Sequence, residues 1–170
     1  MNREVWGPRF WTIFHTMAEC VGCQSNKIMA NDEAEAWILL LKSQPFVMPC
    51  AVCKNHLVIY LRLHSLDKLR TIYGEERYIW LKSWLYQLHE HVNRNKNVEG
   101  HVSTGNTGNT VVPCVTIENL ATLYPRRKLD PEFSACCGMF QKAFELQKLK
   151  PDDVHRWKLA LSRLRKLYGI

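Results

Sequence analysis

The sequence has no apolar run long enough to cross a membrane. A transmembrane helix needs about 18 or more consecutive apolar residues, and no stretch of the 170 residues approaches that length. The first residues also lack the run of about 7–15 apolar residues behind basic ones that is typical of a secretory signal. We therefore expect a chain that has no membrane partner and works in the compartment where it is made.

Evidence for β-strands is also scarce. Alternation of apolar and polar residues with a period of two is nearly absent, apart from a short trace over 110–116. Apolar residues recur instead at three- and four-residue spacing, and no heptad pattern is long enough for a coiled coil. The sequence thus predicts an all-α fold, with helices over about 6–22, from Asn31 to Pro45, from Pro49 onward, from Gly74 through the longest helix, and near 117–124, 131–148 and 152–168.

A segment of flexible composition divides the chain. Its centre, Gly105-Asn106-Thr107-Gly108-Asn109-Thr110, consists of residues that favour turns and loops. We expect a core of four helices over residues 1–97, a flexible loop over 98–113 and a helical C-terminal extension over 114–170.

The charge balance is basic, with a formal net charge of +7. Such a balance favours acidic partners in general and selects none of them. Basic residues gather in the last expected helix, around a stripe of Trp157, Leu161 and Leu164. We interpret them as the solvated face of a helix whose stripe is buried, and do not expect nucleic acid as a partner.

Seven cysteines are many for a chain in which we expect no signal peptide. Three close pairs stand out, and one cysteine is alone: Cys20 with Cys23, Cys50 with Cys53, Cys136 with Cys137, and Cys114. In a reducing compartment such pairs are more often redox-active or metal-binding than structural. The cysteines are therefore the first place to look for chemistry.

Cys50 and Cys53 are three apart at an expected helix start, directly after Pro49. Two cysteines at this spacing can close a small disulfide that exchanges easily. The N-terminal amides of the helix would stabilise a thiolate at Cys50 and make it a better nucleophile or leaving group. Attachment of a c-type haem is excluded, because Lys54 and not histidine follows the second cysteine.

A zinc site is the alternative for these cysteines. Four thiolates from Cys20, Cys23, Cys50 and Cys53 would satisfy tetrahedral zinc. However, 26 residues separate the two pairs, which is longer than the usual spacing of about 15–20. The spacing weakens the idea of a zinc-stabilised interaction or nucleic-acid-binding module without removing it.

Two further pairs of residues share helix faces. Trp11 and His15 are four apart in the first helix, and His89 and Asn93 are four apart in the longest. Taken singly, the first pair is typical of core packing and the second of a polar helix face.

The order of these motifs along the chain is more specific. Trp6-Gly7-x3-Trp11-x3-His15, then Pro49-Cys50-x2-Cys53, then Trp84-x4-His89-x2-Val92-Asn93 resembles the Erv/ALR family of FAD-linked sulfhydryl oxidases over about residues 5–97. The resemblance implies a four-helix bundle with a short fifth helix and FAD at one end. It also implies an enzyme that oxidises dithiols through Cys50–Cys53 and passes the electrons to FAD and then to oxygen, giving hydrogen peroxide.

The resemblance also assigns roles to single residues. Cys53 would lie against the flavin, and Cys50 would accept electrons from the incoming dithiol. Trp11 and His15 would line the flavin pocket, and Trp84, His89 and Asn93 would hold the adenosine portion. The full set of expected cofactor contacts is Gly7, Trp11, His15, Trp84, His89, Val92, Asn93 and Lys96; no metal is expected.

This sequence departs from the family pattern in two places. Glu90 follows His89 where the family usually has asparagine, so one cofactor contact is in doubt. No cysteine lies between Cys53 and Cys114 to form the structural disulfide of the cellular enzymes. The chain is more similar to members from large DNA viruses, which implies the host cytoplasm or the virion as its location.

Partners follow from the same resemblance. We expect protein thiols or a thioredoxin-like carrier as substrates, and a homodimer formed through the first two helices, with Trp37 and Ile38 at the interface. Cys136 and Cys137 are candidates for a shuttle disulfide, although two partly buried thiols are the preferred interpretation. The pairing of Cys20, Cys23 and Cys114 stays open.

Overall fold

The computed structural model describes residues 3–98, 116–146 and 149–170. Within these ranges the chain forms α-helices, short 3₁₀ helices and no strand, so the predicted all-α fold is confirmed. None of the described helices has both the length and the apolar character that a membrane span requires. The elements are α1 (Arg3–Ala18), α2 (Lys27–Ser43), η1 (Gln44–Val47), α3 (Ala51–Leu63), η2 (Asp67–Arg70), α4 (Gly74–Val98), α5 (Leu120–Leu123), α6 (Asp130–Glu145) and α7 (Pro151–Tyr168).

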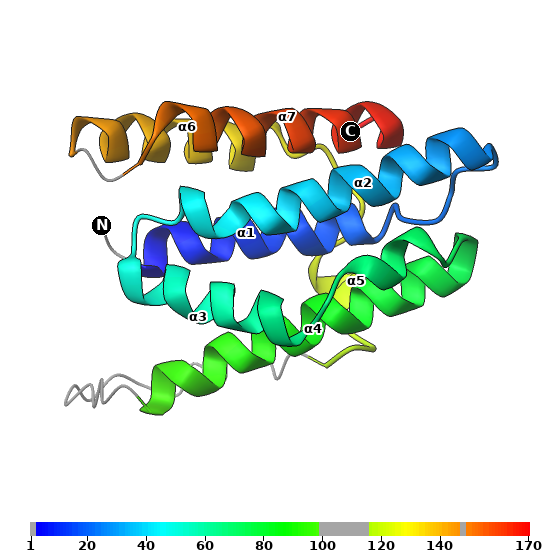
Figure 1. Cartoon of the computed structure of the whole chain (residues 1–170), viewed down its shortest axis with the longest axis horizontal. Coiled ribbons are helices and arrows are strands. Elements are labelled where there is room, and N and C mark those ends of the chain that lie inside the picture. Colours follow the sequence, from blue (N-terminus) through cyan, green and yellow to red (C-terminus); the bar gives the residue numbers. More distant parts are fainter. Residues whose placement is uncertain (1–2, 99–115, 147–148) are drawn as a thin grey trace.

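The helices form three layers (Figure 1). α1 and α2 lie in the middle, α3 and α4 cover one side, and α6 and α7 cover the other. α1 is apolar nearly all round because it has neighbours on both sides. Phe10 meets the indole of Trp157 in α7, whereas Trp11 meets the ring of His89 in α4. α1 thus carries residues that contact both outer layers.

Two helix starts differ from the sequence prediction. α2 begins four residues before Asn31, because Asn26 is the N-cap and its side-chain oxygen accepts a hydrogen bond from the Ile28 amide at 2.8 Å. α3 begins at Ala51, two residues after the predicted start at Pro49, because the Cys50 sulfur accepts a hydrogen bond from the Cys53 amide. Cys50 therefore caps its own helix.

α1 ends at Ala18, short of the predicted position 22. The chain needs Gly22 for the turn that follows, where φ is +81°. A Cβ at this position would lie 2.2 Å from the carbonyl oxygen of Gly74. The glycine thus lets the end of the first helix approach the start of the longest one.

The C-terminal extension is built into the same core as the N-terminal bundle. The predicted helices 117–124, 131–148 and 152–168 appear as α5, α6 and α7, with α5 reduced to one turn. Trp157, Leu161 and Leu164 are buried as predicted for the stripe of the last helix. The two parts share one hydrophobic cluster; the expectation that residues 1–97 act as a separate functional unit stays a prediction, and the expected loop over 98–113 falls almost entirely outside the described residues.

The predicted dimer residues are wrong. Trp37 is fully buried and Ile38 is 4% exposed, because α7 packs along the face of α2 that carries them. The Trp37 indole donates a hydrogen bond to the Tyr168 hydroxyl at 2.8 Å. The extension thus occupies the surface that the sequence analysis assigns to a second copy, and the homodimer itself stays a prediction.

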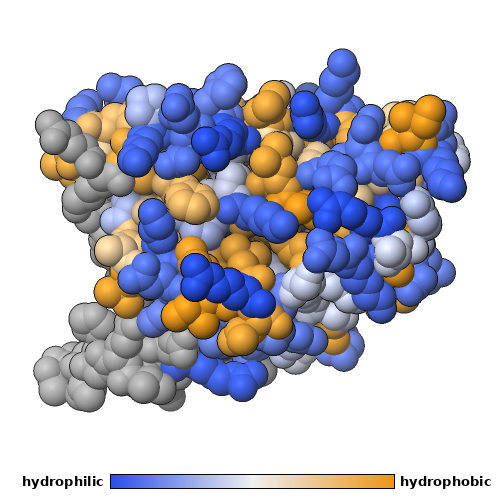
Figure 2. Space-filling view, viewed as in Figure 1, coloured by the Kyte–Doolittle hydropathy of each residue, from blue (hydrophilic) through white to orange (hydrophobic). Residues whose placement is uncertain are grey.

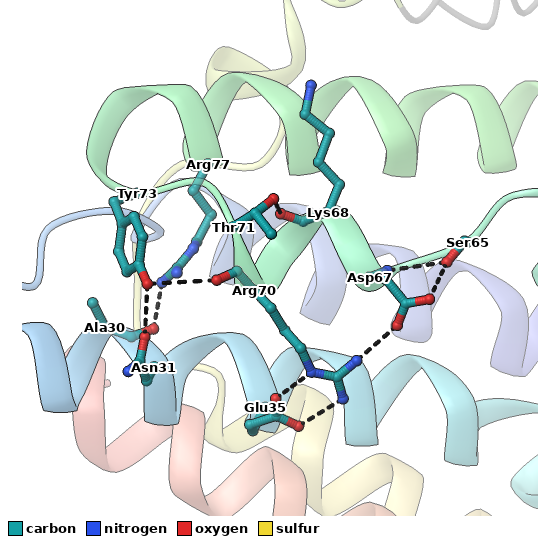
Figure 3. A network of polar contacts seen from close by, with 10 residues as sticks. All are labelled: Ala30, Asn31, Glu35, Ser65, Asp67, Lys68, Arg70, Thr71, Tyr73 and Arg77. Carbon is teal, nitrogen blue, oxygen red and sulfur yellow. Dashed lines mark hydrogen bonds and ion pairs between the residues drawn. The ribbon is translucent and has the colours of Figure 1, made fainter.

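A buried ion pair ties α2 to α4. Glu33 and Arg77 are both fully buried, with 2.9 Å between the carboxylate and the guanidinium. Arg77 also donates to the carbonyl oxygens of Ala30 and Ile72. Figure 3 shows the Arg77–Ala30 contact, with the exposed contacts of Arg70 to Glu35 and Asp67 beside it. A buried ion pair therefore joins α2 to the first turn of α4, and an exposed ion pair joins α2 to η2.

We predict that Arg77→Met lowers the free energy of unfolding by about 3–5 kcal/mol, because Glu33 is left buried without its counter-charge. Urea denaturation followed by circular dichroism measures the change. Arg70→Met is the matched control, since its pair with Glu35 is exposed to solvent, and it should change stability little. Equal changes in the free energy of unfolding for the two substitutions would show that the buried pair contributes no more to stability than the exposed one.

Candidate redox site

A disulfide between Cys50 and Cys53 lies at the start of α3. Their Cα atoms are 5.3 Å apart, and the Cys53 amide donates a hydrogen bond to the Cys50 sulfur at 3.2 Å. Both cysteines are half-buried, so the bond is within reach of another thiol. Because a helix N-terminus and an amide both favour a thiolate, the geometry suits Cys50 as the sulfur that exchanges with a partner.

The inner face of α3 leads from the disulfide into the core. Cys53, Leu57 and Tyr60 lie at helical spacing on this face, and the latter two are buried. The ring of Tyr60 meets the indole of Trp84 edge-on, with 5.5 Å between centroids, and the ring of His91 at 5.0 Å. An aromatic wall thus connects the cysteine helix to α4.

Two polar atoms in this wall have no partner. The Tyr60 hydroxyl and the Trp84 indole nitrogen are buried and make no hydrogen bond to any described residue. Burial also raises the pKa of Tyr60, so the hydroxyl keeps its proton at neutral pH. Because buried polar groups are nearly always paired, these two atoms indicate where a bound group with hydrogen-bonding atoms would fit.

Trp11, His15 and His89 form a second aromatic group between α1 and α4. The Trp11 and His89 rings are stacked, with 4.1 Å between centroids and 13° between planes. His15 Nε2 and His89 Nδ1 are 3.1 Å apart, so one ring nitrogen donates to the other. The structure therefore brings Trp11 and His15, which were predicted to line the flavin pocket, together with His89, which was predicted to hold the adenosine portion of the same cofactor.

His15 is held in its neutral form. Burial, the neighbouring His89 and then Lys82 lower the pKa of His15 from 6.5 to about 3. A neutral imidazole has one donor and one acceptor nitrogen, which is what a shared hydrogen bond with His89 requires. Above pH about 3 the pair can therefore present aromatic faces and hydrogen-bonding atoms without a positive charge on His15.

The extension adds a residue to this group that the sequence analysis missed. Tyr124 follows α5, and its ring stacks on His15 with 4.7 Å between centroids. Tyr60 was also missed as a site residue, although its position seven residues after Cys53 on the same helix face was a usable signal. No periodicity pointed to Tyr124, because it lies beyond residues 98–113 and outside the resemblance.

The remaining predicted residues lie on the same two helices. Trp84 is buried on α4, Gly7 on α1 and Asn93 on α4 are half-buried, and half-buried Val92 packs against the core. Lys96 belongs to α4, with its side chain outside the described part of the structure. The cofactor contacts assigned to these residues stay predictions.

The zinc alternative gains no support. Cys50 and Cys53 are bonded to each other, whereas Cys20 and Cys23 are free thiols, the first buried and the second exposed. Among the residues that the structure describes, no three or more histidine, cysteine, aspartate or glutamate side chains gather to hold a metal ion. The four cysteines do not form one site.

The proposed shuttle pair is not bonded in the structure. Cys136 and Cys137 are free thiols on α6, which packs against α1. Burial, with a smaller contribution from Cys137, raises the pKa of Cys136 to about 12. A thiol with such a pKa is a weak nucleophile at neutral pH, which favours the interpretation of partly buried thiols. Cys114, the remaining cysteine, lies outside the described residues.

Comparison with known proteins finds two distant relatives. The chain is 31% identical over 62 residues to the "Putative FAD-linked sulfhydryl oxidase 347L" of Invertebrate iridescent virus 6. These aligned residues are 36% of this chain and 52% of that protein. It is 26% identical over 101 residues to the "Putative FAD-linked sulfhydryl oxidase 096R" of Invertebrate iridescent virus 3, covering 57% of this chain and 60% of that protein.

The chain thus spans between half and two thirds of the curated relatives that it matches. No protein-family model matches the sequence. No solved structure matches it either.

We predict that His15 makes the stability of the protein depend on pH. Its folded pKa of about 3 lies below the unfolded value of 6.5, so below pH 6.5 the unfolded chain binds more protons and stability falls. Between pH 7 and pH 5 this loss amounts to about 2 kcal/mol. Urea denaturation at the two pH values should show a smaller loss for His15→Phe than for the wild type. Equal losses in both proteins would contradict the burial of a neutral His15.

Proposed function

We propose that the protein is an FAD-linked thiol oxidase that forms disulfide bonds in protein substrates. The observation that carries the proposal is the Cys50–Cys53 disulfide at the start of α3, on a helix whose inner face continues into an aromatic wall. The names of the two viral relatives support the same activity and the same cofactor.

The residues of the aromatic wall and of the second aromatic group fit a flat aromatic cofactor. Trp11, His15 and His89 offer stacked ring faces, and the unpaired atoms of Tyr60 and Trp84 offer a hydroxyl and an indole N–H. Stacking on aromatic faces and a few placed polar groups are what an aromatic ligand needs. When bound here, FAD would accept two electrons from the cysteines and transfer them to oxygen, giving hydrogen peroxide.

The two cysteines carry out the thiol chemistry. A substrate thiolate attacks the Cys50 sulfur, the Cys50–Cys53 bond breaks, and Cys53 leaves as a thiolate. The second thiolate of the substrate then attacks the substrate sulfur that is bonded to Cys50. The substrate disulfide forms, and Cys50 leaves as a thiolate. The Cys53 amide and the helix N-terminus stabilise this thiolate. The substrate has lost two electrons, and the protein now holds a reduced Cys50 and Cys53.

The chain's own residues then set up the transfer of those electrons. Cys53 shares the face of α3 that carries Leu57 and Tyr60 inward, and we assign its sulfur to the side of the aromatic wall on that ground. Buried Leu57, Tyr60 and Trp84 keep water away from this side of the disulfide. Cys50 faces the substrate, and Cys53 faces the cofactor.

We predict that Cys53→Ser abolishes oxygen consumption driven by dithiothreitol but leaves FAD bound, because the working disulfide is lost while the aromatic residues are kept. The purified protein should be yellow in both forms, with flavin absorbance near about 450 nm. Cys23→Ser is the control, since Cys23 is an exposed free thiol. Persistent oxygen uptake by Cys53→Ser would show that another pair does the work.

We predict that His89→Ala weakens FAD binding about tenfold, because a stacked ring and a hydrogen bond to His15 are both removed. The ratio of flavin to protein absorbance after gel filtration, and a titration of the apoprotein with FAD, measure the loss. His155→Ala, which changes an exposed residue of α7, should bind FAD as the wild type does. Full retention of FAD by His89→Ala would place the cofactor elsewhere.

A further inference from the structure

The outward face of α3 carries more apolar than polar residues, which is unusual for a surface helix. Its exposed residues are Ala51, Val52, Asn55, Ile59, Arg62 and Leu63; we call them the outer face of α3. Val52 and Ile59 are each 53% exposed and Leu63 is 75% exposed. The polar residue Tyr60 points inward instead. Single exposed aliphatic residues are ordinary, but several that share one face of a helix indicate a contact surface.

The row begins inside the redox motif. Val52 lies between Cys50 and Cys53, and Ile59 and Leu63 follow it at seven and eleven residues, which places all three on one stripe of the helix. The stripe is about 16 Å long at the rise of an α-helix. An extended segment of about five residues would match that length. Figure 2 shows apolar side chains at the surface of this part of the molecule, next to hydrophilic ones.

The formal charges between residues 36 and 66 have one sign. No aspartate or glutamate occurs from residue 36 to residue 66, whereas Lys42, Lys54 and Arg62 do. Arg62 is exposed on the outer face itself, and Lys54 lies at its edge over the ring of Phe46, which is 43% exposed. A partner with an acidic group would be attracted here, and a basic one repelled.

We propose that the outer face of α3 is the docking surface for the protein substrate, and that it selects thiol-bearing segments in which apolar residues and an acidic residue adjoin the cysteines. The inference rests on the proposed function, because it takes Cys50 as the sulfur that the substrate attacks. The apolar stripe holds the segment along α3, and Arg62 pairs with its carboxylate. Small dithiols need no such contact.

The test compares substrates on the FAD-loaded full chain. Oxygen uptake is measured with dithiothreitol and with peptides of about ten residues that carry a reduced cysteine pair, apolar neighbours and either glutamate or lysine. The double variant Ile59→Ser/Leu63→Ser should raise the KM for the glutamate peptide about tenfold and leave dithiothreitol turnover unchanged. The matched control is Ile28→Ser/Ile79→Ser, because Ile28 and Ile79 are 71% and 55% exposed on other helices.

The charge contact is tested by Arg62→Glu. The wild type should have a lower KM for the glutamate peptide than for the lysine peptide, and Arg62→Glu should reverse that order. Thermal unfolding of each variant checks that the fold is intact. An unchanged KM in the Ile59/Leu63 variant, or an unchanged order in Arg62→Glu, overturns the docking surface while leaving the oxidase proposal intact.

A binding measurement separates the two proposals. The same peptides with serine in place of cysteine are titrated against the wild type and the double variant by fluorescence anisotropy. If the wild type consumes no oxygen with dithiothreitol, the oxidase proposal fails, and the docking surface then depends on this titration alone. Weaker binding by the double variant supports the surface, and equal binding overturns it.

Discussion

The structure depends on the buried pair of Glu33 and Arg77. Each residue is fully buried, so neither charge can turn to water, and the two must stay together. Glu33 also accepts hydrogen bonds from the Gly22 amide at 3.2 and 3.3 Å. The turn after α1, the first half of α2 and the start of α4 therefore meet at one charged point. This constraint limits the rotation of α4 about its axis, and with it the directions in which its later side chains can point.

The consequence appears about two to three turns further along α4. With its first turn held by Arg77, the helix presents Trp84 to Tyr60 of α3 and His89 to Trp11 and His15 of α1. The two contacts use different faces of one helix, so one element positions both the wall behind the disulfide and the paired histidines. Burial keeps His15 neutral, which suits a site that stacks an aromatic ligand better than one that binds an anion by charge.

Helical spacing in the sequence predicted most of what lies within single helices. It placed Trp11 with His15 and gave the stripe of α7, because side chains four apart share a face whatever surrounds them. Contacts between distant segments were harder to predict. Tyr124 reaches His15 from the extension, and α7 covers Trp37 and Ile38. Only the packing of the whole chain decides such contacts. The start of α2 was misjudged because Asn26 and Asn31 are equally good N-caps by residue type.

The central claim is that electrons from a dithiol reach FAD through Cys50 and Cys53. The most direct measurement is an anaerobic titration of the FAD-loaded protein with a reduced dithiol, followed by absorbance near about 450 nm. The account predicts that the flavin absorbance is lost as dithiol is added and returns when oxygen is admitted. Absorbance that stays unchanged with excess dithiol, in protein whose Cys50–Cys53 disulfide has been reduced, would contradict it.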